Sequence, residues 1–180
     1  DEFAAEQSGR AFDAFIRRNL ATGATIVFRR ELLTVALPFP DGWVHDEWLA
    51  AVAAATGRVD VLREATIDYR QHESNQIGVA APTLRGKVKR VLEPRGRRNE
   101  ILAERFATLA ERLAQLGDAV PPEKLRVAEN KARFEAERAA FPANRLRRVG
   151  SVRRLAASGR YGLFASRGRA DVMRDLLQPA

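Results

Sequence analysis

The chain has 180 residues, a length that suits one ordinary domain with an appendage. Its hydrophobic fraction of 46% and charged fraction of 30% are typical of soluble globular proteins, which excludes wholesale disorder. Cysteine is absent, so disulfides, thiol nucleophiles and cysteine-ligated zinc or iron–sulfur sites are excluded, and a reducing, cytoplasmic location is expected.

Charge divides the chain into an acidic and a basic half. The formal net charge is +8. Residues 1–84 hold 8 Lys or Arg and 12 Asp or Glu, a net charge of −4, whereas residues 85–180 hold 23 and 11, a net charge of +12. This asymmetry indicates an anionic partner for the second half, such as nucleic acid, a membrane surface or a phosphorylated ligand.

The first predicted elements are a helix, a strand and another helix. Apolar residues at helical spacing predict a short helix over residues 11–20. Residues 24–30, with the sequence ATIVFRR, are rich in β-branched and apolar side chains, which indicates a buried strand. Residues 30–37 then indicate a short helix that Pro38 stops, and a loop follows.

A longer helix is predicted to begin at His45. It has acidic residues in its first turn, strong helix formers throughout, and Gly57 just past its end. Residues 58–62 and 65–70 alternate in character and are predicted as two short strands. Mixed helices and strands in this order predict an α/β layer structure for residues 1–80.

After residue 80 the predicted elements are helices, so we expect a basic helical extension over residues 81–180. Within residues 97–140, apolar side chains on one side predict a helical hairpin, and alternating Glu and Arg residues predict a solvated exterior. The expected helices cover residues 84–92, 97–116, 122–140, 144–157 and 168–177.

The chain has two histidines, and the first lies in a polar cluster at the start of a predicted helix. There, His45 precedes Asp46 and Glu47. The dipole and free N–H groups of a helix N-terminus stabilise an ionised carboxylate, so Asp46 is a candidate base. The alternative is that Asp46 only caps the helix.

The second polar cluster lies at the end of the strand predicted for residues 65–70. It gathers the hydrogen-bonding side chains of Arg70, Gln71, His72 and Asn75. Strand ends commonly carry binding residues in α/β folds, so the cluster is a candidate binding site. A solvated polar turn is the alternative.

Taken in order, these segments make residues 19–78 resemble the later half of family 2 glycosyltransferases, in particular the rhamnosyltransferase-like bacterial members with a GT-A fold. A weaker likeness to the tail of that family lies in Tyr161 and residues 174–177. The matching segments are Asn19–Thr25, Leu37–Pro40, His45–Trp48, and Tyr69–His72 with Asn75 and Gly78.

The resemblance implies a partial GT-A-like α/β half and an inverting single displacement in which Asp46 is the general base. It also implies that His72 is a candidate metal ligand. For Trp48, packing in the core is the alternative to contact with a sugar. The residues that the resemblance implies in substrate binding are Gly23, His45, Trp48, Arg70, Gln71, His72 and Asn75.

The implied ligands are a nucleotide-sugar donor, a glycan or lipid-linked acceptor, and a divalent metal, Mg or Mn. In the family, the metal is bound mainly by a D-x-D motif upstream of the matched region. No D-x-D occurs in this sequence. We therefore expect the chain to be a fragment that lacks the nucleotide-binding half and is inactive alone.

Residues 143–160 place apolar side chains at i, i+3 spacing among six arginines. This pattern is typical of a helix on an anionic membrane surface, here the inner face of the plasma membrane. A solvated helical face is the alternative. Two other functions stay open: a basic helical nucleic-acid-binding protein and a scaffold domain without catalysis. No recognised nucleic-acid-binding motif occurs, so no nucleic-acid partner is expected.

Overall fold

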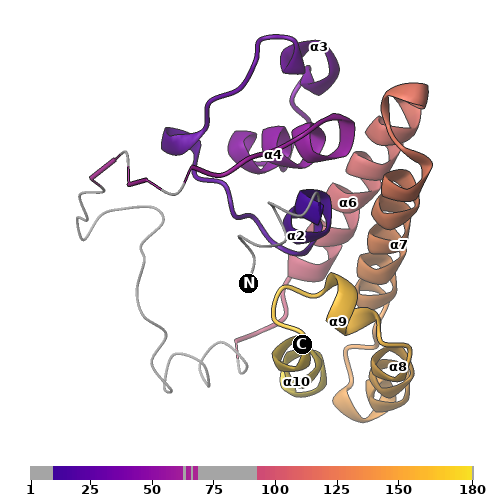
Figure 1. Ribbon diagram of the computed structural model, residues 1–180. Helices are drawn as coiled ribbons and strands as arrows, with labels where there is room; N and C mark the ends of the chain where they lie inside the picture. Colours follow the sequence, from indigo (N-terminus) through magenta and orange to yellow (C-terminus); the bar gives the residue numbers. More distant parts are fainter. Residues whose placement is uncertain (1–9, 63, 66, 69–92, 180) are drawn as a thin grey trace.

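The computed structural model describes residues 10–62, 64–65, 67–68 and 93–179. Three helices form its N-terminal part, and five form its C-terminal part (Figure 1). Single 3-10 turns cover Gly23–Thr25 and Gly117–Ala119. The helices are α2 Ala11–Arg17, α3 Leu32–Ala36, α4 His45–Thr56, α6 Arg98–Gln115, α7 Pro122–Ala139, α8 Arg145–Ala157, α9 Arg160–Phe164 and α10 Arg169–Leu177.

The α/β fold predicted for the first half is wrong, because all regular structure in the described residues is helical and no strand occurs there. The stretch 24–30 leaves its 3-10 turn in an extended conformation without a pairing strand, and Val27 is 97% exposed. Residues 58–62 are irregular. β-Branched side chains favour a strand only where a neighbouring strand and a half-buried surface are available, and the described residues provide no neighbouring strand for either segment.

Most of the predicted helices are confirmed, because their start and stop signals act as expected. Pro122 occupies the first turn of α7. The side-chain oxygen of Asn144 accepts hydrogen bonds from the backbone N–H groups of Leu146, at 2.9 Å, and Arg147, at 3.3 Å, which caps α8. Helix α9 was not predicted. Gly159, which has a φ of 76°, separates it from α8. The helix predicted for residues 84–92 lies outside the described residues.

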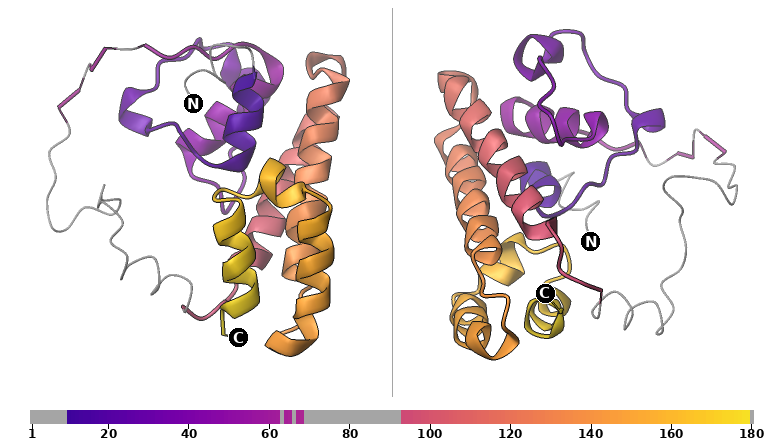
Figure 2. Two further views of the ribbon diagram at one scale, coloured as in Figure 1. Left: turned by 60° about the horizontal axis from the view of Figure 1, so that its bottom comes forward. Right: turned by 180° about the vertical axis from the view of Figure 1, so that it is seen from behind.

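Helices α6 and α7 form an antiparallel hairpin, as predicted, and the other helices pack around it (Figures 1 and 2). Helix α2 contacts α7 and α9, while α8, α9 and α10 gather at the end of the hairpin where α7 leaves it. The hairpin is centred on Leu109, Leu113 and Phe134, which are all fully buried. It therefore forms the framework on which the N-terminal helices lie.

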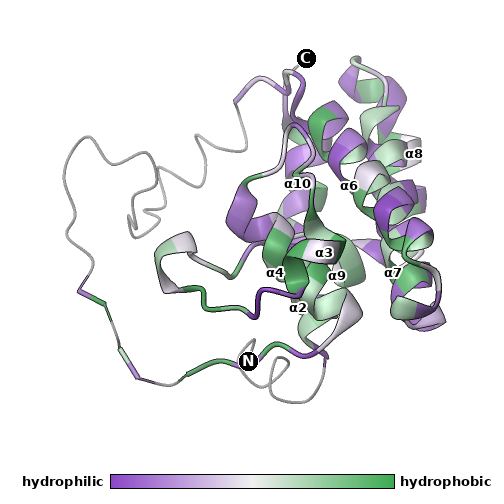
Figure 3. Ribbon diagram, turned by 90° about the horizontal axis from the view of Figure 1, so that it is seen from above, coloured by the Kyte–Doolittle hydropathy of each residue, from purple (hydrophilic) through white to green (hydrophobic). Residues whose placement is uncertain are grey.

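One hydrophobic core includes residues from before and after residue 80. Eight of the twelve residues of α4 are buried, and its ribbon is mostly hydrophobic in Figure 3. The Trp43 ring meets the Phe106 ring of α6 edge-on, with centroids 5.7 Å apart. The division into residues 1–80 and 81–180 stays a prediction, but these contacts join the described parts of both.

A buried ionic network holds the C-terminal helices together. The Arg138 guanidinium of α7 donates to Glu135 at 2.8 Å and to both oxygens of Asp175 in α10, at 2.7 and 3.0 Å. Lys131 donates to Glu135 at 2.6 Å, and the Tyr161 hydroxyl of α9 donates to Asp175 at 2.6 Å. This result corrects the prediction of a solvated exterior, because these charges face the core.

Arg95 closes the open end of the α6–α7 hairpin. Its guanidinium donates to the backbone carbonyls of Arg138, Ala139 and Phe141, where α7 ends. Its backbone N–H donates to the carbonyl of Pro179 at 2.9 Å. Arg95 therefore joins three segments, which are the residues before α6, the end of α7 and the end of the chain.

Tyr161 is expected to resist ionisation in the folded protein. Burial, and then the neighbouring carboxylate of Asp175, raise the pKa of Tyr161 above its ordinary value of about 10. Since the folded pKa is raised, the stability that this group contributes is complete below about pH 10 and is lost as pH rises further.

The chain has only one other tyrosine, Tyr69, so a Tyr69→Phe variant isolates the signal of Tyr161. Absorbance at 295 nm is expected to show no phenolate at about pH 11 in the folded variant, and full ionisation after unfolding in urea. A normal titration near pH 10 in the folded state would contradict the buried hydrogen bond to Asp175.

Candidate functional site

Asp46 lies in the first turn of α4 and joins that helix to the segment before it. Its Oδ2 accepts a hydrogen bond from the backbone N–H of Gly23 at 3.0 Å, and its Oδ1 accepts one from the N–H of Glu47 at 2.7 Å. The N-cap residue of α4 is Val44, so Asp46 is not the N-cap. Asp46 is 8% exposed, and it binds a second segment of the chain rather than only capping its own helix.

His45 lies directly against Gly23. A Cβ atom added to Gly23 would come within 2.9 Å of His45 Nε2 and 3.6 Å of Asp46 Oδ2. A larger side chain at Gly23 would therefore displace the imidazole. The structure brings together three of the predicted site residues, Gly23, His45 and Asp46, which we call the Asp46 site.

Trp48 lies in the core behind this site. It is fully buried, its indole N–H donates to the carbonyl of Ala36 at 2.7 Å, and its ring meets that of Trp43 edge-on at 5.3 Å. Both faces of the Trp48 ring are thus occupied by protein. This geometry favours the core-packing alternative over stacking on a sugar.

The other predicted site residues, Arg70, Gln71, His72 and Asn75, lie outside the described residues. Their position relative to Asp46 is therefore an open prediction. Within the described ranges, no three His, Asp or Glu side chains come together as metal ligands. The described residues do not fit a divalent metal by themselves, and we derive no chemical step from one.

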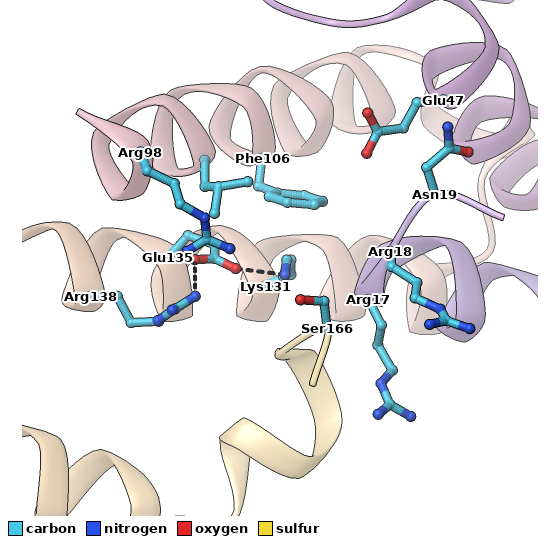
Figure 4. A pocket seen from close by; sticks show the side chains of 11 residues that line it. Arg17, Arg18, Asn19, Glu47, Arg98, Phe106, Lys131, Glu135, Arg138 and Ser166 are labelled. Carbon is cyan, nitrogen blue, oxygen red and sulfur yellow. Dashed lines mark hydrogen bonds and ion pairs between the residues drawn. The ribbon is translucent and has the colours of Figure 1, made fainter. Parts of the chain in front are cut away.

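A small pocket lies beside the Asp46 site, and sequence analysis did not predict it (Figure 4). Its volume is about 190 Å³. We call it the Arg98 pocket. It is lined by Arg17, Arg18, Asn19, Glu47, Arg98, Leu102, Phe106, Lys131, Glu135, Arg138 and Ser166.

A sequence signal for this pocket does exist. Lys131, Glu135 and Arg138 lie three and four positions apart on α7, on the same face as the buried Ala128 and Phe134. Charges that share a helical face with core residues must be paired or must surround a polar site. The prediction of a solvated exterior covered the Glu and Arg residues of this hairpin together, so it did not separate these three buried charges from the exposed ones.

Helix α8 uses its apolar face for the core. Val152 and Leu155 are buried against the protein, whereas Leu146 is 85% exposed. Arg148 is buried as well and donates to the backbone carbonyls of Leu176 and Gln178. The apolar stripe predicted for membrane contact is thus mostly inside the protein, and the exposed cations that remain on α8 are Arg145, Arg147, Arg153 and Arg154.

No helix in the described part of the chain combines the length and the hydrophobicity that crossing a bilayer requires. Comparison of the chain with models of protein families, with curated proteins and with solved structures finds no match.

Proposed function

We propose that the Asp46 site is the acceptor side of a nucleotide-sugar glycosyltransferase, with Asp46 as the general base. The observation that supports this most is the hydrogen bond from the Gly23 N–H to Asp46 Oδ2, with His45 beside it. Three residues of two distant segments, each of which the family resemblance assigns to the site, meet there. A carboxylate fixed in this way has a defined orientation, as a base requires.

The remaining hydrogen-bonding capacity of Asp46 suits proton abstraction. Each carboxylate oxygen can accept two hydrogen bonds, and each one accepts a single backbone N–H here. A lone pair is left to receive the proton of an acceptor hydroxyl. As the proton moves to Asp46, the hydroxyl oxygen bonds to the anomeric carbon and the bond from that carbon to the nucleoside diphosphate breaks, with inversion.

The exposed imidazole of His45 can hydrogen-bond the acceptor beside the base. The family resemblance implies that Arg70 and His72 stabilise the departing diphosphate. The D-x-D motif that binds most of the metal in the family does not occur in this sequence. We therefore propose that this chain binds the acceptor, which is a glycan or a lipid-linked saccharide.

Much of the positive charge in the second half serves internal contacts, which weakens the nucleic-acid alternative. Arg95, Lys131 and Arg138 bond to carbonyls or carboxylates inside the protein. Lys124 donates to the carbonyl of Ala54 at 2.7 Å. The exposed arginines of α8 remain available for an anionic membrane surface, where they would act by charge rather than by insertion.

A Gly23→Ala substitution tests the assembled site. The added methyl group is expected to displace His45 and lower the rate of glycosyl transfer by about tenfold to a hundredfold. The free energy of unfolding is expected to change by less than about 1 kcal/mol, because an exposed imidazole can move. Transfer is measured as nucleoside diphosphate released from a panel of nucleotide sugars, with the protein as its gene encodes it.

Gly150→Ala is the matched control, because a Cβ added there meets no atom within 4 Å. This variant should transfer sugar at the wild-type rate. If no nucleotide sugar is consumed by the wild type, or if Gly23→Ala retains full activity, the proposed function is wrong.

A further inference from the structure

The Arg98 pocket combines two arginines, Arg98 and Arg17, that form no ion pair within the described residues, with carboxylates that are already engaged. Glu47 forms an ion pair with Arg105, and Glu135 is bonded by both Lys131 and Arg138. The negative charges on the pocket wall are therefore neutralised within the protein. The charge that remains is positive.

Arg98 is the clearer case of these two arginines. It lies at the start of α6 and is only half exposed, yet its one hydrogen bond in the described residues is a 3.2 Å contact with the side-chain oxygen of Asn99. Burial, and then the neighbouring guanidinium groups of Arg174 and Arg138, lower the pKa of Arg98. In Arg174 the Nε atom is buried, and it has no hydrogen-bond partner in the described ranges.

Arg17 and Asn19 are further donors that line the pocket. In Figure 4, Arg98 lies near Glu135 and Arg138, Asn19 lies beside Glu47 on the other side of Lys131, and the Arg17 side chain extends below them. The side chain of Arg17 forms no hydrogen bond or ion pair within the described part of the chain. Asn19 accepts from the N–H of Ala21 through its side-chain oxygen, which leaves its NH₂ group available as a donor.

The size of the pocket limits its ligand. A volume of about 190 Å³ is below the range of roughly 300 to 1,000 Å³ for pockets that take drug-sized molecules, and it is about six times the roughly 30 Å³ of a water molecule. Guanidinium groups match the planar, two-point geometry of phosphate oxygens. A compact anion suits this volume, and both Arg98 and Arg17 are among the residues that line the pocket.

We propose that the Arg98 pocket binds a small polyanion that carries phosphate groups, with Arg98 and Arg17 as the charged donors. Inorganic pyrophosphate is the simplest probe of this kind. The proposal does not depend on glycosyl transfer, because binding is measured without any sugar donor, so the two can fail separately.

The test is isothermal titration calorimetry of the full chain with pyrophosphate and with phosphate, at constant ionic strength. Pyrophosphate is expected to bind with one-to-one stoichiometry and more tightly than phosphate. An Arg98→Gln variant should bind pyrophosphate at least about tenfold more weakly. The matched control is Arg126→Gln, which removes an exposed cation of α7 outside the pocket and should change the affinity by less than about twofold.

Thermal unfolding distinguishes ligand binding from a structural role. Without ligand, Arg98→Gln should be about as stable as the wild type, because burial and the repulsion from Arg174 and Arg138 outweigh the attraction of the Arg98 charge to Asp171 and Glu135. With pyrophosphate, the wild type should gain thermal stability and the variant should not. Binding of the wild type and of Arg98→Gln to phosphatidylcholine vesicles, with and without phosphatidic acid, then distinguishes a lipid headgroup from a soluble phosphate. If the ligand is a headgroup, binding to the acidic vesicles depends on Arg98, whereas for a soluble phosphate it does not.

Three results would overturn the proposal. One is the absence of binding both to pyrophosphate at millimolar concentration and to the acidic vesicles. Another is equal weakening of binding by Arg98→Gln and Arg126→Gln, which would indicate general charge attraction. The third is binding of citrate, a carboxylate of similar charge, as tight as that of pyrophosphate.

Discussion

An Asp46→Asn variant is expected to transfer sugar about 10² to 10⁴ times more slowly than the wild type, because the amide cannot accept the acceptor proton. Substitution also places an NH₂ group against the N–H of either Gly23 or Glu47. One of these two hydrogen bonds is lost, at a cost of about 1 to 3 kcal/mol in the free energy of unfolding. Both the rate and urea denaturation are therefore measured.

Asp171→Asn provides the control for this stability cost. Asp171 is also a buried aspartate, and its Oδ2 accepts the backbone N–H of Arg167 at 2.8 Å. Its loss of stability should be no larger, because the amide oxygen of the substituted side chain can still accept the Arg167 N–H, and it should keep its transfer rate. Equal rates for Asp46→Asn and the wild type would remove Asp46 as the base.

An Arg138→Met variant is expected to lose about 3 to 5 kcal/mol of stability, measured by urea denaturation. The substitution leaves both oxygens of Asp175 without their cation in the interior, whereas Glu135 keeps Lys131. Domains of this kind are stable by only about 5 to 15 kcal/mol, so the variant would be near the limit of folding.

The exposed Arg133 on the same helix gives the matched comparison. It forms a 3.4 Å ion pair with Glu129, and Arg133→Met should cost no more than about 1 kcal/mol. Adding Asp175→Leu to Arg138→Met should recover part of the loss, since it removes the buried unpaired charge. A cost below about 1 kcal/mol for Arg138→Met alone would show that the network does not stabilise the fold.

The sequence predicts the helices well because their signals are local. Gly57 ends α4, Pro122 begins α7 and Asn144 caps α8, and each acts within a few residues of itself. Strands depend on distant partners, so the apolar stretch 24–30 could not be assigned from its own composition. In the structure the extended backbone after Gly23 has no neighbouring strand among the described residues.

The same distinction applies to the candidate site. The resemblance selected Gly23, His45 and Asp46, and their proximity emerges only when α4 packs beside the segment before it. The Arg98 pocket draws side chains from five separate parts of the chain, so the charge pattern on α7 alone could not show which other residues line it. Burial also decides between alternatives that sequence leaves open, as Trp48 and the apolar face of α8 show.

The position of Arg95 has a consequence for the dynamics of the chain. Its side chain holds the last carbonyls of α7, while its backbone bonds Pro179 and the side chain of Gln178 reaches the carbonyl of Pro94. Fraying of the C-terminal residues would therefore release the end of the hairpin at the same moment. We therefore expect these segments to behave as a single cooperative unit, in which amide hydrogen exchange at either end proceeds through one shared opening event.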